Sequence, residues 1–583
     1  MRGSTIYDSK QLSMNLSLCL ISCLVLCSST PVNAQIVDAA MRDDVAKITS
    51  LLLDGGEVNA AHGDGMTALH WAAENGNQEI TRILLESGAD TELVTRLGAY
   101  RPLHLAARQG HISVVELLLS ASADPLAESS TGKVTPLHFA SSSGSTEVVR
   151  ALILGEAELD VKESIWGQTP LMFAAAAGRT EVVQELLQAG SDPAITALVI
   201  DMPSRDEFDR EDQRARSKQM SELQSTGSTS TVPLNEQQLL LVQQRDRIDQ
   251  PLSHAQLVGG YGGMTALLLA VRDGHASTAM ALLDHGASID QVSEGDHTSP
   301  LLMALINGHF GLAMELFQRG ADPTIASDAG ATPLYIVLNA EWIPKSRHPQ
   351  PTHRLQQEVT YLDLMKAFLE ADVDPNARLT KQLWYTTFGD DYLRTNRTGA
   401  TPFWRAAYGL DLRAMRLLIE FGADPNIPTK KPAERSYRGG GGAQDPMLDP
   451  SGLPAVPIGG PGSWPIHAAS GIGYGEGFAA NIHRHVPDSW VASVRYLIEE
   501  LGADVNARDH NGYTALHHAA ARGDNKLILY LVSQGADVSV VSRKGQTVAD
   551  MANGPVQRIL PFLSTVALLE GLGSQNNHNC VAC

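Results

Sequence analysis

Cysteine, aromatic residues and charge are all scarce in this 583-residue chain. Only five cysteines occur, and Cys19, Cys23 and Cys27 fall within the first 34 residues. Cys580 and Cys583 are the others, so disulfides do not hold the body together and a disulfide-stapled scaffold is excluded. Aromatic residues make up 5% and charged residues 19%, whereas hydrophobic residues reach 43%. That apolar content supports a packed core and excludes a wholly disordered chain.

Basic residues are also in deficit. The chain has 44 Lys and Arg against 65 Asp and Glu, which gives a net charge of −21. A chain this acidic repels nucleic acid and anionic membrane surfaces, so we expect neither as a partner. Long apolar runs are missing beyond the N-terminus, so no membrane span is expected once that segment is removed.

The N-terminal segment has the pattern of a secretory signal peptide. Arg2 and Lys10 precede a short apolar stretch over 12–26, and small residues follow up to Ala34. This pattern predicts cleavage after Ala34 and a periplasmic or secreted protein. An uncleaved anchor is one alternative. A lipoprotein attached at Cys23 is another, less favoured because the residues after Cys23 stay apolar.

A period of 34 residues runs through the body of the chain. The box Thr67-Ala-Leu-His-Trp-Ala-Ala73 recurs in similar form from Arg101, Thr135 and Thr169, each 34 residues after the last. Further copies begin at Thr265, Ser299, Thr332, Thr401, Pro465 and Thr514, with a worn copy at Thr547. Each copy has a second half, as in Leu417-Leu418 followed by Gly422-Ala423-Asp424.

Each copy encodes two short helices and a hairpin. Thr caps the first helix and Pro fits its first turn. Leu and the Ala pair give that helix a narrow apolar face, and a glycine, as in Gly110-His111, ends it in the left-handed conformation. The Leu-Leu stripe marks the second helix, and Gly-Ala-Asp begins the hairpin. A single copy cannot bury both faces, so the copies stack into one core.

The box and the Gly-Ala-Asp exit resemble the ankyrin repeat family, over most of residues 36–572. The resemblance implies an all-α ankyrin solenoid of about ten to twelve repeats. It also implies a non-catalytic scaffold that binds another protein. The box histidines are expected to be structural. The family's partner-binding groove corresponds here to Met66, Glu74, Asn75, Tyr100, Arg108, Gln109, Arg272, Asp273, Asn307, Tyr513 and Arg522.

The repeats are interrupted. The predicted organisation is repeats over 35–197, a charged insert at 198–262, repeats over 263–427, a Gly/Pro-rich loop at 428–462, repeats over 463–572 and a tail over 573–583. We interpret the insert as a solvated, partly helical loop, with a partner-docking arm as the alternative. An enlarged repeat over 339–399 contains Trp342, Trp384, Tyr385, Phe388 and Tyr392. These aromatics predict a local core or, alternatively, a recognition patch.

No motif predicts catalysis or a metal site. The chain has no nucleophile elbow, no Walker box and no zinc-protease helix motif. The glycine-rich run over 471–477 does not follow a strand, so we discount it as a phosphate loop. His483 and His485 lack further ligands of suitable type, with His467 the one candidate for a third. We therefore predict neither an enzyme nor a bound metal.

The last residues leave one alternative open. Cys580 and Cys583 are spaced as in the attachment motif of c-type haem, but no His follows them. No cofactor is expected unless the natural chain continues beyond Cys583. In that case the protein is the docking half of an exported electron-transfer protein. A third reading, a host-directed effector, is permitted by the signal peptide but not favoured by it.

Overall fold

The computed structural model describes residues 32–225, 252–345, 352–387, 393–433, 449–477, 482–556 and 560–581. Most of the signal segment, Phe388, Tyr392 and Cys583 lie outside these ranges. The chain divides into two units. Unit 1 comprises residues up to Leu198 together with 265–270 and 275–287, and unit 2 comprises 199–264, 271–274 and 288–583. In the described part of the chain, no helix combines the length and apolarity that a bilayer span requires.

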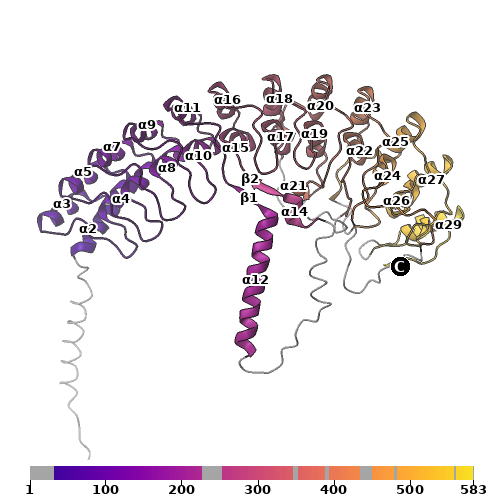
Figure 1. Ribbon diagram of the computed structural model, residues 1–583, viewed down its shortest axis with the longest axis horizontal. Coiled ribbons are helices and arrows are strands. Elements are labelled where there is room, and N and C mark those ends of the chain that lie inside the picture. The colour runs from indigo at the N-terminus through magenta and orange to yellow at the C-terminus, as the bar shows by residue number, and fades with distance from the viewer. Residues whose placement is uncertain are drawn as a thin grey trace, which may run out of the picture. The chain divides into compact units, whose positions relative to one another are not determined.

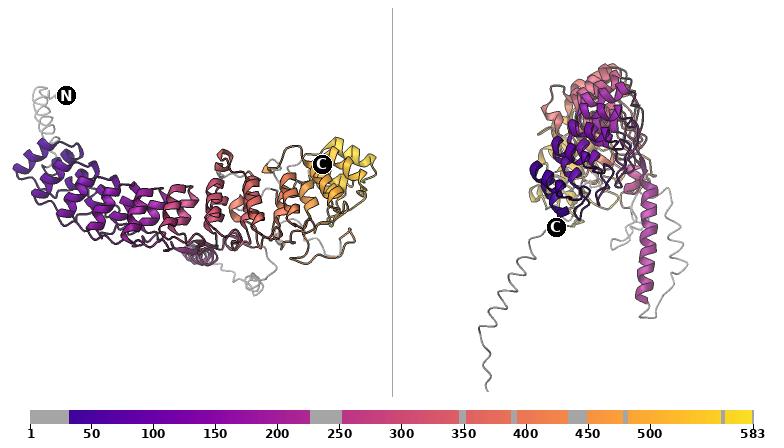
Figure 2. Two further views of the ribbon diagram at one scale, coloured as in Figure 1. Left: turned by 90° about the horizontal axis from the view of Figure 1, so that it is seen from above. Right: turned by 90° about the vertical axis from the view of Figure 1, so that its left-hand side faces the viewer.

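Unit 1 consists of helix pairs that stack side by side in two layers (Figures 1 and 2). The first helices are α2 (Val32–Met41), α4 (Ala68–Asn75), α6 (Pro102–Gln109), α8 (Pro136–Ser143) and α10 (Pro170–Ala176). The second helices are α3 (Val45–Leu53), α5 (Gln78–Glu86), α7 (Ile112–Ser120), α9 (Thr146–Leu154), α11 (Thr180–Ala189) and α16 (Ala276–Asp284). Helix α15 (Ala266–Arg272) crosses the division between the units.

Unit 2 repeats the same arrangement. Its first helices are α17 (Pro300–Ile306), α19 (Pro333–Glu341), α22 (Pro402–Tyr408), α24 (Pro465–Ser470), α26 (Ala515–Ala521) and α28 (Val548–Ala552). Its second helices are α18 (Phe310–Gln318), α20 (Tyr361–Glu370), α23 (Leu412–Glu420), α25 (Trp490–Arg495, continued by a π turn over Tyr496–Glu500), α27 (Asn525–Ser533) and α29 (Leu563–Gly571). Short helices η2 (His353–Gln356) and α21 (Trp384–Thr387) lie in the enlarged repeat.

The repeat box forms the first helix as its residue types predict. In α4 the Thr67 side chain accepts from the backbone N–H of His70, and the His70 ring bonds back to the Thr67 N–H, which completes a capping box. Leu69, Ala72 and Ala73 are buried against neighbouring first helices. Full burial of such a Leu contributes about 2 kcal/mol, and the small Ala side chains let the helices approach closely.

In several repeats the glycine that ends the first helix is needed for contact with the next repeat. Gly76 has φ of 73°, and a Cβ placed on it would lie 2.6 Å from the His111 ring. The Nε2 atom of His111 is 3.1 Å from the carbonyl oxygen of Glu74, so the ring caps the end of the preceding helix. Within unit 2, Gly274 and His309 repeat this arrangement. The Gly of one turn and the His of the next turn thus belong to one inter-repeat contact.

The two ends of the predicted insert pair with each other in a two-stranded ribbon in unit 2. Strand β1 (Val199–Asp201) pairs antiparallel with β2 (Gly260–Gly262), which brings the two ends of the segment together. Between them lie α12 (Met202–Ser225) and α14 (His254–Val258). Helix α12 is mostly exposed, and ion pairs four residues apart, such as Arg205–Asp209, connect its turns.

Part of the enlarged repeat forms a local core. The Asp411 carboxylate is buried, and its Oδ2 accepts from Trp342 Nε1 at 3.0 Å and from the Tyr361 hydroxyl at 2.6 Å. Burial, together with the Asp411 carboxylate, raises the pKa of Tyr361. Trp384 and Tyr385 pack edge to face with ring centroids 5.7 Å apart. For Trp342 the structure favours the local-core interpretation over a recognition patch.

The C-terminal tail covers the last repeat. Asp550 takes the helix position that His occupies in the repeat box, and it is fully buried. Its Oδ1 accepts from the backbone N–H groups of Asn577 at 2.9 Å and Asn579 at 3.3 Å. The tail therefore lies where a following hairpin would lie, and it closes the end of the stack.

Candidate partner-binding groove

The box histidines join successive repeats. His70, His104 and His138 each place Nε2 within 3.2 Å of a carbonyl oxygen in the next hairpin, those of Tyr100, Val134 and Gln168. Burial lowers the pKa of His104 and of His138 to about 4, so both rings are neutral at neutral pH. Their contacts confirm the prediction of a structural role.

The hairpins of unit 1 are hydrogen-bonded tip to tip. The backbone N–H of Arg96 donates to the carbonyl of Asp64, Ser130 to Gly98, Ser164 to Gly132, and Leu198 to Trp166. These bonds are 2.7–2.9 Å long. The tips therefore form one continuous edge, on which a side chain of one hairpin is held at fixed spacing from that of the next.

The six predicted groove positions of unit 1 lie beside this edge. A cavity of about 360 Å³ is lined by Met66, Glu74, Tyr100 and Arg108, together with Trp71 and the tip residue Leu97. Arg108 donates to Glu74 at 2.8 Å, and Gln109 Nε2 donates to the same carboxylate at 2.7 Å. Asn75 is exposed and donates to Asp43. The structure thus brings the six unit 1 positions onto the surface between helix ends and hairpins.

Two residues that were predicted to lie in the groove, Tyr513 and Arg522, are largely buried. Tyr513 is 1% exposed, and its hydroxyl donates to Gln546, so it fills the interior of the last repeats. The Arg522 side chain is 10% exposed, lies over the Trp490 ring with its central carbon 3.1 Å from the ring centroid, and pairs with Asp524. The repeat offset predicts that both side chains lie in the groove. The offset does not take into account contacts with other segments, such as those of Arg522 with the rings of Tyr474 and Trp490.

The other predicted positions of unit 2 remain at the surface. Arg272 and Asp273 are exposed and form an ion pair at 2.8 Å. Asn307 is half-buried, and its amide donates to the carbonyl of Met303 on its own helix. These side chains are accessible but bonded locally, so a partner must compete with those bonds.

Sequence reasoning missed the apolar residues at the hairpin tips of unit 1. Leu97 is 77% exposed, Ile165 50% and Trp166 49%. Each tip has a glycine, and Leu97 and Trp166 directly precede theirs, Gly98 and Gly167. That position is polar in the tips at Asp64 and Thr131. An apolar residue directly before the tip glycine is therefore the sequence feature that could have predicted these exposed residues.

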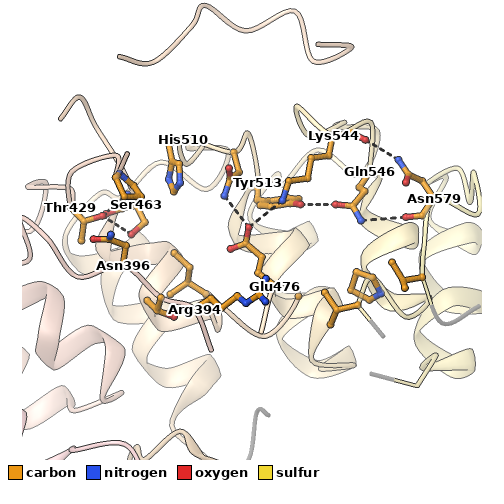
Figure 3. Close-up of a pocket in the computed structure, with 18 of the residues that line it drawn as sticks. Arg394, Asn396, Thr429, Ser463, Glu476, His510, Tyr513, Lys544, Gln546 and Asn579 are labelled. Atoms are coloured by element: carbon orange, nitrogen blue, oxygen red, sulfur yellow. Dashed lines mark hydrogen bonds and ion pairs between the residues drawn. The ribbon is translucent and has the colours of Figure 1, made fainter. Parts of the chain in front are cut away.

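Unit 2 contains a larger cavity, of about 430 Å³, between its last hairpins and the C-terminal tail (Figure 3). Glu476 lies in its wall, where it accepts from Asn511 at 2.9 Å and pairs with Lys544 at 3.6 Å. Lys430 and Arg394 line it as well. The glycine-rich run over 471–477 supplies part of this wall.

That glycine-rich run does not have the geometry of a phosphate loop. The backbone N–H groups of Tyr474, Glu476 and Gly477 donate to carbonyls of Gly471 and Gly473 within the run, so they do not point outward at a ligand. His483 and His485 are also used internally. His483 bonds the Tyr408 carbonyl and the Tyr474 hydroxyl, and His485 bonds the carbonyl of Val486. Over the described ranges, no group of three or more His, Cys, Asp or Glu is arranged to hold a metal.

The haem alternative for Cys580 and Cys583 stays a prediction. Cys580 is disulfide-bonded, so its sulfur would have to be reduced before it could form a thioether with a porphyrin. Cys583 lies outside the described residues. The neighbouring His578 lies before the pair rather than after it. We therefore derive no chemistry through a haem group.

Helix pairs joined by hairpins, with an accessible groove beside the hairpin edge, define a repeat scaffold of the protein-binding kind. Family models described as ankyrin repeats match residues 36–129, 103–197 and 237–327, a many-copy model matches 482–532, and a single-repeat model matches 398–430. Together these cover more than half of the chain. The chain belongs to the ankyrin repeat family, and its fold is an all-α ankyrin solenoid.

Curated relatives match over single stretches. A mitochondrial disaggregase of Bos taurus is 41% identical over 61 residues, which is 10% of this chain and 9% of the relative. Ankyrin repeat and SAM domain-containing protein 6 of Rattus norvegicus is 34% identical over 76 residues, 12% of this chain and 9% of the relative. Ankyrin repeat domain-containing protein 49 of Homo sapiens is 42% identical over 52 residues, 9% of this chain and 22% of the relative. The matches thus span under a quarter of each of these relatives.

Proposed function

We propose that this protein is a non-catalytic scaffold that binds a protein partner along the hairpin edge and groove of unit 1. The observation that carries the proposal is the exposure of Leu97, Ile165 and Trp166 on hairpin tips that hydrogen bonds hold at fixed spacing. Exposed large apolar side chains on a rigid edge, next to a cavity, are typical of a protein interface.

The cavity beside Leu97 indicates what such a partner presents. Trp71 and Tyr100 supply apolar surface, and Arg108 and Glu74 supply charge at its margin. The Trp71 Nε1–H group is buried and has no hydrogen-bond acceptor among the described residues. An extended peptide segment with an apolar side chain and a free backbone carbonyl satisfies both features.

The test compares matched surface changes within unit 1. The double variant Leu97→Ser/Trp166→Ser removes two apolar tip residues, and the control Leu154→Ser removes a residue that is 80% exposed at the end of a second helix. Proteins crosslinked to the wild type in extracts of the source cells are identified by mass spectrometry. We expect at least one to be lost with the double variant and kept with the control. Equal retention by all three proteins contradicts the proposal.

We also propose export after cleavage behind Ala34. Support comes from the signal-like pattern of the first residues and from where the core begins: Gln35 is half-buried, and Ile36 and Val37 are fully buried in α2. Cleavage after Ala34 keeps these buried residues in the mature chain. Mass spectrometry of the purified protein tests the proposal, which requires an N-terminus at Gln35. A chain that retains its first residues contradicts it.

A further inference from the structure

We propose that the unit 2 cavity binds a small organic anion through a carboxylate group. The cavity collects three cationic side chains, those of Arg394, Lys430 and Lys544, and one anionic side chain, that of Glu476. The cavity therefore has a local excess of positive charge, although the net charge of the chain is −21. A cationic recess of this kind concentrates anions locally that the rest of the chain repels.

The negative charge of Glu476, the single acidic residue that lines the cavity, is already paired with a cation. Glu476 accepts a hydrogen bond from Asn511 at 2.9 Å, and the Lys544 ammonium lies 3.6 Å from the same carboxylate. Lys430 is exposed and forms no ion pair with any described residue. A ligand carboxylate therefore has one cation, Lys430, that no acid in the described ranges neutralises.

A second observation points to a ligand at the same place. Thr395 lines the cavity and is 2% exposed, yet its hydroxyl has no hydrogen-bond partner among the described residues. A buried hydroxyl without a partner lowers stability, so its occurrence in a cavity wall requires an explanation. The Nδ1 atom of His510, also in the wall, is likewise buried without a partner. A bound oxygen-rich ligand satisfies these groups.

The size and lining of the cavity narrow the ligand class. A volume of about 430 Å³ holds a small molecule or a few residues of peptide. Ile472, Val556 and Val581 contribute apolar surface, and Asn396 and Gln546 contribute amides. The ligand is therefore a carboxylate on a short carbon skeleton. The same chemistry is available from a free dicarboxylate and from an acidic residue of a peptide.

Three side-chain changes test the site. Lys430→Gln removes the uncompensated cation, and Lys366→Gln is the control, since Lys366 is an exposed lysine on α20, away from the cavity. Thr395→Val replaces the buried hydroxyl by a methyl group of similar shape. Because that hydroxyl has no partner, this variant should unfold at the same temperature as the wild type or higher.

Binding is measured by calorimetry on the full chain at constant ionic strength. The probes are succinate, the tripeptide Gly-Gly-Glu and inorganic phosphate. We expect succinate or the tripeptide to bind, with the affinity reduced about tenfold by Lys430→Gln and by Thr395→Val and unchanged by Lys366→Gln. Whichever of the two binds more tightly identifies the source of the carboxylate.

Two results overturn the inference. One is that neither succinate nor the tripeptide binds. The other is that binding occurs but is unaffected by Lys430→Gln and Thr395→Val, or is equally strong for inorganic phosphate, which shows only general attraction of anions. Neither result bears on the unit 1 proposal, because that proposal depends on Leu97 and Trp166.

Discussion

The Oδ1 atom of Asp550 accepts a hydrogen bond of 2.9 Å from the backbone N–H of Asn577. In four other repeat boxes a His ring at this position meets a backbone carbonyl of the following repeat, as His138 meets Gln168. At Asp550 the neighbouring segment is the tail, which presents N–H groups instead of a carbonyl. A carboxylate, which only accepts, matches that change of partner.

The first prediction concerns this tail contact. Replacing Asp550 with Ala leaves the N–H groups of Asn577, Asn579 and Thr547 without their acceptor. We expect a local loss of about 2 kcal/mol, confined to the last repeat because repeat proteins can open from their ends. Hydrogen exchange should become faster at the tail and in α28 while α26 keeps its protection.

The control for this change is Asp537→Ala. Asp537 lies in an exposed hairpin, and among the described residues its carboxylate accepts from Ser539 alone. Its removal should leave exchange in the tail as in the wild type. Faster exchange throughout unit 2 in the Asp550 variant would show that the tail contact is not a local cap.

A second prediction concerns the buried carboxylate of the enlarged repeat. Asp411 caps α23 by accepting from the Ala414 N–H, and it also accepts from Trp342 and Tyr361. Asp411→Ala should lower the free energy of unfolding by about 3 kcal/mol, because three donors lose their acceptor at a buried site. Urea denaturation followed by tryptophan fluorescence measures the change.

Removing one of these donors separates the contributions. Tyr361→Phe deletes the hydroxyl and leaves the ring and the cap in place, so it should cost less than Asp411→Ala. If the two variants are equally unstable, the helix cap and the Trp342 bond contribute little.

A third prediction concerns the charge at the groove. Arg108→Glu reverses the charge beside Glu74, and Arg150→Glu does the same beside Glu185 on the second-helix layer. Both arginines are exposed and ion-paired, so helical content and unfolding midpoint should change little in either variant. Capture of a partner found by the crosslinking test should weaken only with Arg108→Glu. Equal weakening by Arg150→Glu would point to a general charge effect.

A fourth prediction concerns pH. Burial lowers the pKa of His104, His138 and His467 from 6.5 to about 4. The unfolded chain therefore binds more protons than the folded chain between these values, so stability is full above about pH 6.5 and falls as the pH drops toward about 4. At about pH 5 each such His costs about 2 kcal/mol.

Single substitutions test this assignment. In His104→Gln one titrating group is gone, so unfolding midpoints measured by urea denaturation should fall less steeply with decreasing pH. The exposed His285 serves as the control, and His285→Gln should keep the wild-type slope. A slope that is the same in all three proteins would contradict a role for His104 in acid sensitivity.

The local pattern of the repeats could be predicted from the sequence because its causes are local. The Thr cap, the Leu and Ala face and the glycine end of each first helix act within one repeat, and α4 shows all three. The groove could be predicted only where the repeats are regular. Glu74 and Arg108 lie at the surface as the repeat offset indicates. Tyr513 and Arg522 are largely buried by contacts that the offset does not take into account, those of the Tyr513 hydroxyl with Gln546 and of the Arg522 guanidinium with the Trp490 ring.

The sequence by itself determined the family, the helix pairs and the structural role of the box histidines, because these follow from short-range spacing that recurs along the chain. Only the tertiary structure decided which side chains meet across repeats. The contacts of His111 with Glu74, of Asp411 with Trp342 and of Asp550 with the tail join residues 27 to 69 positions apart. Burial at such distances depends on how neighbouring repeats and inserted segments pack, and no single repeat encodes that packing.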